Sequence, residues 1–147
     1  MQIFLGADHA GFTAKNAVAA YLRTHSAHEV HDFGPATPDP ADDYPDIAAR
    51  VASAVHAAGD EARGILFCGS AEGVCMAANK FVGIRAGIGY SIAATQSMRR
   101  DNDANILCLP GRLPVQDDIF AILEMFLGTP FSQEERHVRR KSKLDLF

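Results

Sequence analysis

The sequence predicts an α/β fold in which a parallel sheet is covered by helices on both faces. Short apolar segments typical of buried strands recur along the chain and alternate with segments whose apolar residues repeat at helical spacing. Short loops join the two kinds of segment, which is the pattern of parallel sheets built from strand–helix–strand units. In such folds ligands bind at the carboxyl ends of the strands, so the loops that follow the strands are the first candidates for function.

The first half of the chain contains two strands, each followed by a helix. Residues 2–7 (QIFLGA) form an apolar run that stops at Asp8, and apolar residues then recur at helical spacing from residue 14 to about residue 24. Residues 28–33 (HEVHDF) are expected to form the second strand. Three prolines make 34–43 an irregular loop. The next helix opens at Tyr44-Pro45-Asp46, where the missing N–H of proline costs little, and it ends at Gly59.

The third strand contains the apolar run 65–67. The small-residue loop 68–73 follows it, and residues with helical composition begin again at Val74. Residues 83–90 are expected to form the fourth strand, and 91–100 a helix of small residues closed by Asp101-Asn102-Asp103. Residues 106–109 form the fifth strand and 110–114 a turn. A further amphipathic helix contains Ile119, Ile122, Leu123 and Phe126 and ends at Gly128. Ser132 and Glu135 fit a capping box for a last helix.

Composition favours one soluble domain over residues 1–147. The chain has 147 residues, of which 48% are hydrophobic and 22% charged, and these values suit a single globular core. The net charge of −4 gives no reason to expect nucleic acid or an acidic membrane as a partner. No apolar run approaches the roughly 20 residues that a membrane helix needs, and the N-terminus lacks the features of a secretory signal.

The cysteines favour a cytoplasmic protein without a metal site. They are Cys68, Cys75 and Cys108; their number is odd and each lies in an apolar context, as expected for free thiols in a reducing compartment. Their spacing is not that of a zinc site, and the six histidines do not cluster near them. Cys75 and Cys108 are expected to pack in the core.

The loop after the third strand carries the strongest candidate for chemistry. Cys68 is a candidate base or nucleophile because the start of a helix favours a thiolate. Ser70 could donate to an oxyanion, together with the backbone N–H groups from Gly69 to Val74, which include those of Ala71 and Gly73. Glu72 would repel a bound oxyanion, so we expect it to cap the helix or face solvent; it is also a reserve candidate for the base. The alternative is an ordinary turn with a buried cysteine.

Polar residues also follow the first and fifth strands. His9 can donate to a phosphate or hydroxyl, and Asp8 can accept from sugar hydroxyls, although Asp8 could instead cap the next helix. Arg112 follows the fifth strand. Arg136 and Arg140 share a face of the last helix at a spacing that suits a phosphate, with a solvated basic tail as the alternative. Together these residues predict a small-molecule site.

Six motifs in this order resemble the ribose-5-phosphate isomerase B / galactose-6-phosphate isomerase family: ADHAG, DYPD, CGSAEGVCMAANK, GIRA, NDANIL and RHVRRK. The resemblance covers nearly the whole chain. It implies a single Rossmann-like α/β/α sandwich with a five-stranded parallel sheet and a C-terminal helix, assembled as a homodimer or homotetramer with sites shared between subunits. It also implies aldose–ketose isomerisation of a phosphorylated sugar, ribose 5-phosphate before others, through a cis-enediolate and without a metal or organic cofactor.

The resemblance also implies roles for single residues. Cys68 matches the cysteine that moves a proton between C1 and C2, and Ser70 stands where the family usually has threonine. The loop Gly69–Val74 matches the anion hole for the enediolate. Residues matching substrate- or phosphate-binding positions are Asp8, His9, Tyr44, Asn102, Arg112, Arg136 and Arg140. The arginines are expected to act across the dimer.

Two departures from the family pattern affect the expected site. Ala71 replaces a glycine, which removes the freedom for positive φ and is expected to add a methyl group close to the substrate. Asp101 replaces a histidine that helps to open the sugar ring. A carboxylate could still act as a base toward the anomeric hydroxyl, but it cannot donate as a cation. A substrate that needs no ring opening, such as a tetrose phosphate, would explain Asp101, and so would a subunit that needs a paralogous partner.

Three function hypotheses therefore remain. The first is an aldose–ketose isomerase of a short phosphorylated sugar. The second is a non-catalytic or partner-dependent sugar-phosphate binder, motivated by Asp101 and Glu72. The third, a nucleotide-binding signalling domain, shares the fold class, but the first strand–helix turn lacks G-x-G-x-x-G and the chain has no Walker loop.

Overall fold

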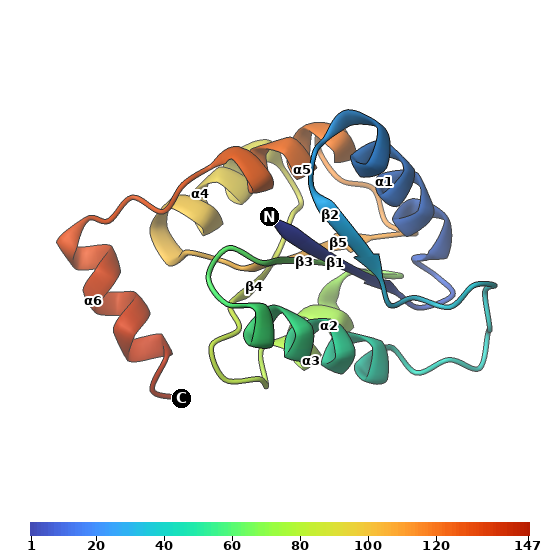
Figure 1. Cartoon of the computed structure of the whole chain (residues 1–147), viewed down its shortest axis with the longest axis horizontal. Coiled ribbons are helices and arrows are strands. Elements are labelled where there is room, and N and C mark those ends of the chain that lie inside the picture. The colour runs from blue at the N-terminus through green and yellow to red at the C-terminus, as the bar shows by residue number, and fades with distance from the viewer.

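The computed structural model describes all residues, Met1–Phe147, and contains a sheet of five strands and six helices (Figure 1). The strands are β1 (Gln2–Ala7), β2 (Glu29–Asp32), β3 (Arg63–Cys68), β4 (Ala86–Ile88) and β5 (Ile106–Pro110). The helices are α1 (Phe12–His25), α2 (Tyr44–Ala58), α3 (Glu72–Ala78), α4 (Ile92–Asn102), α5 (Ile119–Gly128) and α6 (Glu135–Leu144). No helix is both long and apolar enough to cross a membrane.

All strand pairs are parallel, and the strands lie in the order β2-β1-β3-β5-β4. The predicted Rossmann-like α/β sandwich is confirmed. The division of the chain into one domain, 1–147, stays a prediction. Because each helix returns the chain from the carboxyl edge of the sheet to its amino edge, the loops after β1, β3 and β5 meet at one edge.

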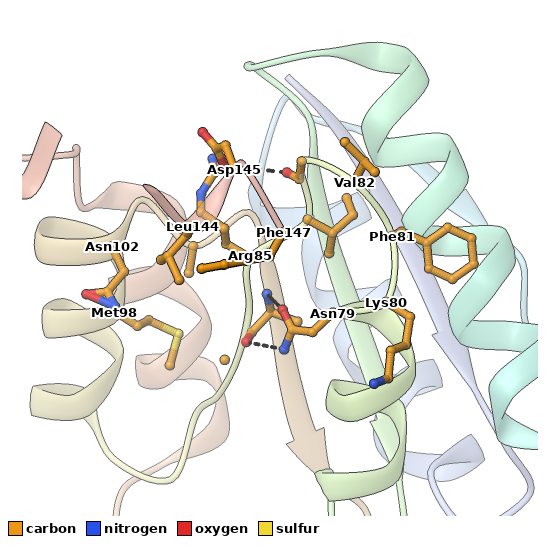
Figure 2. A pocket seen from close by; sticks show the side chains of 15 residues that line it. Asn79, Lys80, Phe81, Val82, Arg85, Met98, Asn102, Leu144, Asp145 and Phe147 are labelled. Carbon is orange, nitrogen blue, oxygen red and sulfur yellow. Dashed lines mark hydrogen bonds and ion pairs between the residues drawn. The ribbon is translucent and has the colours of Figure 1, made fainter. Parts of the chain in front are cut away.

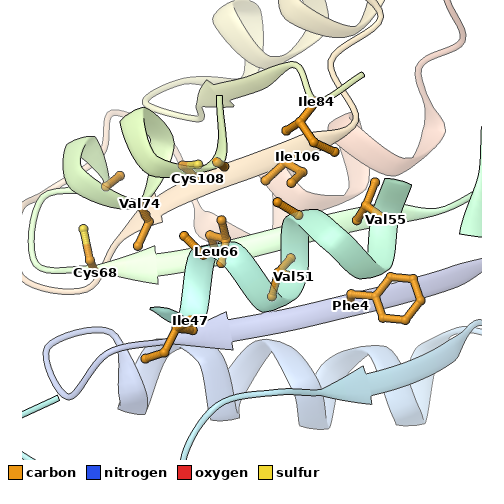
Figure 3. Packing of buried hydrophobic residues seen from close by; sticks show 14 of the residues in the cluster. Phe4, Ile47, Val51, Val55, Leu66, Cys68, Val74, Ile84, Ile106 and Cys108 are labelled. Atoms are coloured by element: carbon orange, nitrogen blue, oxygen red, sulfur yellow. The ribbon is translucent and has the colours of Figure 1, made fainter. Parts of the chain in front are cut away.

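Both faces of the sheet are buried, which explains why its central strands are continuously apolar rather than alternating. On one face, α2 and α3 pack over side chains such as Phe4, Leu66 and Ile106, as Figure 3 shows. On the other face, α1 and α5 pack over Ile3, Leu5 and neighbouring apolar residues. Cys108 lies in the first of these clusters and is fully buried, as predicted, whereas Cys75 packs against the same cluster but is only partly buried.

Helix α6 does not cover the sheet but lies beside it, near the C-terminal end of α4 (Figure 1). Polar contacts join the helix and its flanking residues to the rest of the chain. Arg85 donates to Asp145 at 3.0 Å, and the buried His137 lies 2.8 Å from the Ser132 hydroxyl. The helix therefore exposes most of its surface.

Several predicted boundaries differ from the structure by one or two residues, and three differences change the interpretation. The fourth strand, predicted over 83–90, contains only Ala86–Ile88, because it is an edge strand with a single partner, β5. Helix α4 begins after its N-cap Ser91 and continues through Asn102, so Asp101 lies within the helix rather than after it. The capping box at Ser132 is wrong: Glu134 is the N-cap of α6, while the Ser132 hydroxyl accepts from the Glu134 N–H at 3.3 Å.

Candidate functional site

The three polar clusters predicted to share one edge of the sheet do lie together. The Asp8 N–H donates to the Phe67 carbonyl at 3.3 Å, which joins the loop after β1 to the end of β3. The Gly111 N–H donates to the Cys68 carbonyl at 2.7 Å and the Arg112 N–H to the Gly69 carbonyl at 3.1 Å, which joins the loops after β3 and β5. We call Asp8, His9, Tyr44, the loop 68–74 and Arg112 the carboxyl-edge cluster.

The loops of this cluster approach so closely that glycine is required at one point. A Cβ on Gly111 would lie 2.3 Å from the Ala10 carbonyl oxygen and 2.7 Å from the Gly11 Cα, and neither backbone atom can move aside easily. At Gly69 the space is less tight, because a Cβ there would lie 3.7 Å from the Ala10 Cβ and 3.8 Å from the Arg112 Cδ. The Arg112 side chain and Ala10, the residue after His9, therefore both lie beside Gly69.

Asp8 has a role in this backbone arrangement. Its Oδ1 atom accepts from the Gly11 N–H at 2.9 Å, and the side chain is buried. Gly11 is the N-cap of α1 and no side chain caps that helix, so Asp8 shapes the turn before the helix rather than capping it.

Cys68 is the last residue of β3 and is only 5% exposed, and all cysteines of the chain are free thiols (Figure 3). Beyond it, the Ser70 hydroxyl donates to Glu72 Oε2 at 3.3 Å. Glu72 is exposed in the first turn of α3, so it faces solvent, which is one of the two expected arrangements, and does not cap the helix. No group of three or more His, Cys, Asp or Glu side chains in the chain could hold a metal ion.

Ala71 adopts a left-handed conformation although it is not glycine. It is the N-cap of α3, with φ +74°, a region that disfavours residues with a Cβ. The expected loss of positive φ is therefore wrong. Ala71 is fully buried and packs in the core cluster that also contains Cys68 and Val74, and the closeness of its methyl group to the substrate stays a prediction. Burial of the methyl group offsets part of the strain, since a buried carbon of this size contributes roughly 0.8 kcal/mol.

Tyr44 begins α2 and lies against the start of α3. A Cβ on Gly73 would lie 2.8 Å from the Tyr44 ring, so the ring lies directly on the Gly73 backbone. The phenol is partly exposed, at 38%. This places an aromatic side chain beside the N–H groups of the loop, where the sequence predicted a residue near the sugar.

His9 has a partner that the sequence did not reveal. Its Nδ1 atom lies 2.7 Å from Asp42 Oδ1, across 33 residues of sequence. The side chains are 29% and 13% exposed, respectively. Asp42 lies in the proline-rich loop among several acidic residues, and nothing in the local pattern distinguishes it from its neighbours.

The other predicted site residues lie elsewhere, around a cavity of about 240 Å³ between α4 and α6. This cavity is lined by Asp101, Asn102, His137, Arg140, Lys141 and Leu144. We call Asp101, Asn102, His137 and Arg140 the α6 cluster. Arg136 does not line this cavity: it is 57% exposed and donates to Glu134 at 2.9 Å. His137 was missed by the sequence interpretation, although it lies between the two predicted arginines.

Asp101 is held as a carboxylate by its neighbours. Partial desolvation raises its pKa, but hydrogen bonds from Ser97 at 3.0 Å and Arg100 at 3.3 Å, with the nearby charges of His137 and Arg100, outweigh desolvation and lower the pKa below its usual value. The His137 Nδ1 atom lies 3.6 Å from Asp101 Oδ1. Asp101 is therefore ionised at neutral pH, and the lowered pKa makes its carboxylate a weaker base than an ordinary aspartate.

The two clusters lie at opposite edges of the sheet. Helix α4 leaves the carboxyl edge after β4 and ends at Asn102, immediately before β5 begins at the amino edge. Figure 1 shows helix α6 beside this far end of α4, where the α6 cluster lies. One chain therefore does not bring Asp101, Asn102 or the arginines of α6 to Cys68.

A second cavity, of about 440 Å³, adjoins the α6 cluster and shares Asn102 and Leu144 with the first. Figure 2 shows Met98 and Asn102 of α4 on one side of it and Asn79 and Lys80 on the other. Val82, Leu144 and Phe147 also line it and are largely exposed. A cavity that exposes apolar side chains beside half of a predicted site is a surface suited to contact another protein chain.

Comparison with known proteins gives consistent matches along the whole chain. The family model described as Ribose/Galactose Isomerase matches residues 3–144. The chain is 39% identical over 142 residues to the probable ribose-5-phosphate isomerase B of Mycoplasma genitalium, covering 97% of this chain and 92% of that protein. It is 37% identical over 139 residues to ribose-5-phosphate isomerase B of Escherichia coli, covering 95% and 91%.

Solved structures agree with these matches. The crystal structure of the Mycoplasma genitalium ribose-5-phosphate isomerase B with bound ribulose 5-phosphate has a TM-score of 0.92 and 39% identity, covering 99% of this chain and 94% of that chain. The type B ribose 5-phosphate isomerase of Trypanosoma cruzi has a TM-score of 0.90 and 36% identity, covering 99% and 97%.

Proposed function

Because this chain belongs to the ribose/galactose isomerase family, we propose that it interconverts ribose 5-phosphate and ribulose 5-phosphate. The observation that carries this proposal is the full-length match to a solved ribose-5-phosphate isomerase B with bound ribulose 5-phosphate. The carboxyl-edge cluster supports it from this chain's own residues, since a thiol, a hydroxyl and the backbone N–H groups at the start of α3 meet there, of which the Glu72 N–H already donates to the Ser70 hydroxyl.

In the proposed mechanism Cys68 is the base that moves the proton. Its thiolate takes a proton from C2 of the open-chain aldose and returns it to C1, while the proton on O2 passes to O1, so that no atom is gained or lost. The intermediate is a cis-enediolate whose negative charge needs donors. The Ser70 hydroxyl and the N–H groups from Gly69 to Val74 supply them. Glu72 remains the reserve base, since it lies in the same loop.

Ring opening needs a base at the anomeric hydroxyl, and Asp101 is the group proposed for that step. Its hydrogen bonds from Ser97 and Arg100 hold it ionised and lower its pKa, so it would act there as a weak base and not as an acid. Arg136 and Arg140 are proposed to bind the phosphate, together with Arg112. Asn102 and Tyr44 are proposed to contact the sugar.

We propose that the active enzyme is at least a dimer with each site shared between two subunits. The carboxyl-edge cluster of one subunit would meet the α6 cluster of the other, which is the simplest way to bring Cys68 and Asp101 together. The hollow lined by Val82, Leu144 and Phe147 supports this arrangement, because a second subunit would cover it. The free cysteines support a location in the reducing cytoplasm.

One observation favours a second candidate. Asp101 stands where the resemblance implies a ring-opening histidine, so the chain could instead isomerise a sugar phosphate that has no ring, or bind sugar phosphates only with a paralogous partner. A tetrose phosphate is such a substrate, because its terminal carbon is esterified and cannot close a furanose.

An isomerisation assay on the purified protein tests these alternatives. Ribose 5-phosphate is offered beside tetrose and hexose phosphates, and turnover of each is followed. Turnover of ribose 5-phosphate supports the main proposal. Turnover of the tetrose phosphate alone would replace ribose 5-phosphate by a tetrose phosphate as the proposed substrate. No turnover of any of these sugar phosphates would reject catalysis by the isolated chain.

A further inference from the structure

The contact between His9 and Asp42 is an unusual arrangement for a carboxylate. Asp42 Oδ1 lies 2.7 Å from His9 Nδ1, but Asp42 Oδ2 is buried without any hydrogen-bond partner. A buried carboxylate oxygen with no donor is costly, so the position is not explained by stability alone. Its one hydrogen-bond partner is His9, a residue of the carboxyl-edge cluster.

The hydrogen bond determines which ring nitrogen of His9 is free. A carboxylate oxygen accepts, so Nδ1 carries the proton that it shares with Asp42. The other nitrogen, Nε2, has no protein partner, and the ring is 29% exposed at the edge where Arg112 also emerges. In the doubly protonated ring, Nδ1–H would face a carboxylate and Nε2–H would point toward the site.

We propose that Asp42 is a positioning residue that fixes the His9 ring, so that Nε2–H donates to the phosphate of the substrate. This inference rests on the proposed function, since it assumes a phosphorylated ligand at the carboxyl-edge cluster. A ring held between a carboxylate and a phosphate is satisfied on both sides, and the charge-assisted bonds are stronger than neutral ones. Asp42 thereby contributes to substrate affinity without touching the substrate.

Two variants and one control separate this role from a structural one. Asp42→Ala removes the acceptor, while Asp42→Asn keeps an acceptor for Nδ1–H but removes the charge. Asp46→Ala is the matched control: Asp46 is an exposed acid in the first turn of α2, and its side chain makes no hydrogen bond or ion pair. Folding of each variant is checked by its thermal unfolding curve.

The first readout is kinetic. For Asp42→Ala we expect KM for ribose 5-phosphate to rise about tenfold with kcat within about twofold, the size of one lost charge-assisted hydrogen bond. Inhibition by inorganic phosphate should weaken by the same factor. Asp42→Asn should give a smaller rise, and Asp46→Ala none. A fall in kcat with unchanged KM, or no change in either constant, would overturn the proposal.

The second readout does not need catalysis. Nitrogen NMR of the histidine-labelled wild-type protein should show His9 protonated at Nδ1, and at both nitrogens after addition of inorganic phosphate. In the Asp42→Ala variant, the proton of the His9 ring should no longer prefer Nδ1. A wild-type ring protonated only at Nε2 would refute the inference even if the enzyme is active. Conversely, an inactive wild type with the expected spectra would reject the proposed reaction and leave the His9–Asp42 arrangement standing.

Discussion

Mixing two inactive variants tests whether the site is shared between subunits. Cys68→Ala disables the carboxyl-edge cluster, and Arg140→Ala disables the α6 cluster at the opposite edge of the sheet. In a shared-site homodimer of either variant, both sites are damaged. In a mixed dimer, one site contains both substitutions. The second site contains an intact Cys68 from the Arg140→Ala chain and an intact Arg140 from the Cys68→Ala chain.

The size of the recovery follows from this geometry. Random exchange between equal amounts of the two variants makes about half of the dimers mixed, and each mixed dimer has one intact site. Activity should therefore rise to about a quarter of the wild-type value per subunit. Each parent alone should retain about 1% or less if the changes remove a general base or a phosphate contact.

The assay is ribose 5-phosphate turnover before and after the variants are mixed under conditions that exchange subunits. Mixing each variant with fresh samples of itself is the control. Exchange is followed independently with an affinity tag on one variant. If tagged mixed dimers form and activity still equals the sum of the parents, then Cys68 and Arg140 do not act in one site across the dimer.

Three further predictions concern single residues. Cys68→Ala should lower kcat at least about a hundredfold; near-normal turnover would reject Cys68 as the base, and Glu72→Gln would then be measured. Thr95→Val should stabilise the protein by about 1 kcal/mol, because the Thr95 hydroxyl is fully buried without a partner; a lower urea midpoint would contradict this. The pKa of Asp101 is lower in the folded state than in the unfolded state. The ionised carboxylate therefore contributes to the stability of the fold above the unfolded-state pKa, and this contribution is lost as the pH falls through the folded-state pKa. Urea midpoints measured from pH 6 down to pH 3 should therefore fall less steeply in Asp101→Asn than in the wild type, and parallel curves would refute it.

Local patterns were sufficient to predict the elements of the fold. Strand β1 is apolar from Ile3 to Ala7 because both faces of the sheet are covered, and its predicted bounds, 2–7, agree with the structure. Pro45 marks the start of α2, since proline suits the first turn of a helix. Edge strand β4 was predicted too long because apolar composition does not reveal that only three of its residues find partners on β5.

The residue patterns and the resemblance together named the candidate residues, but they did not predict the conformation of each one. Ala71 shows the limit: it replaces a glycine and still has a positive φ, and its methyl group packs in the core cluster that contains Cys68. The conformation of a turn residue depends on the packing around it, and here the Ala71 side chain is fully buried.

By itself, therefore, the sequence determined the fold class, the order of the strands and helices, and the meeting of Asp8, Cys68 and Arg112 at one edge. These features follow from periodicity and from the rule that parallel strands end at a common edge. Only the tertiary structure decided that His9 meets Asp42, that His137 lies beside Asp101, and that Asp101 and Cys68 lie at opposite edges. The contact between His9 and Asp42 spans 33 positions of sequence, and the packing of whole elements, not a local pattern, sets such distances.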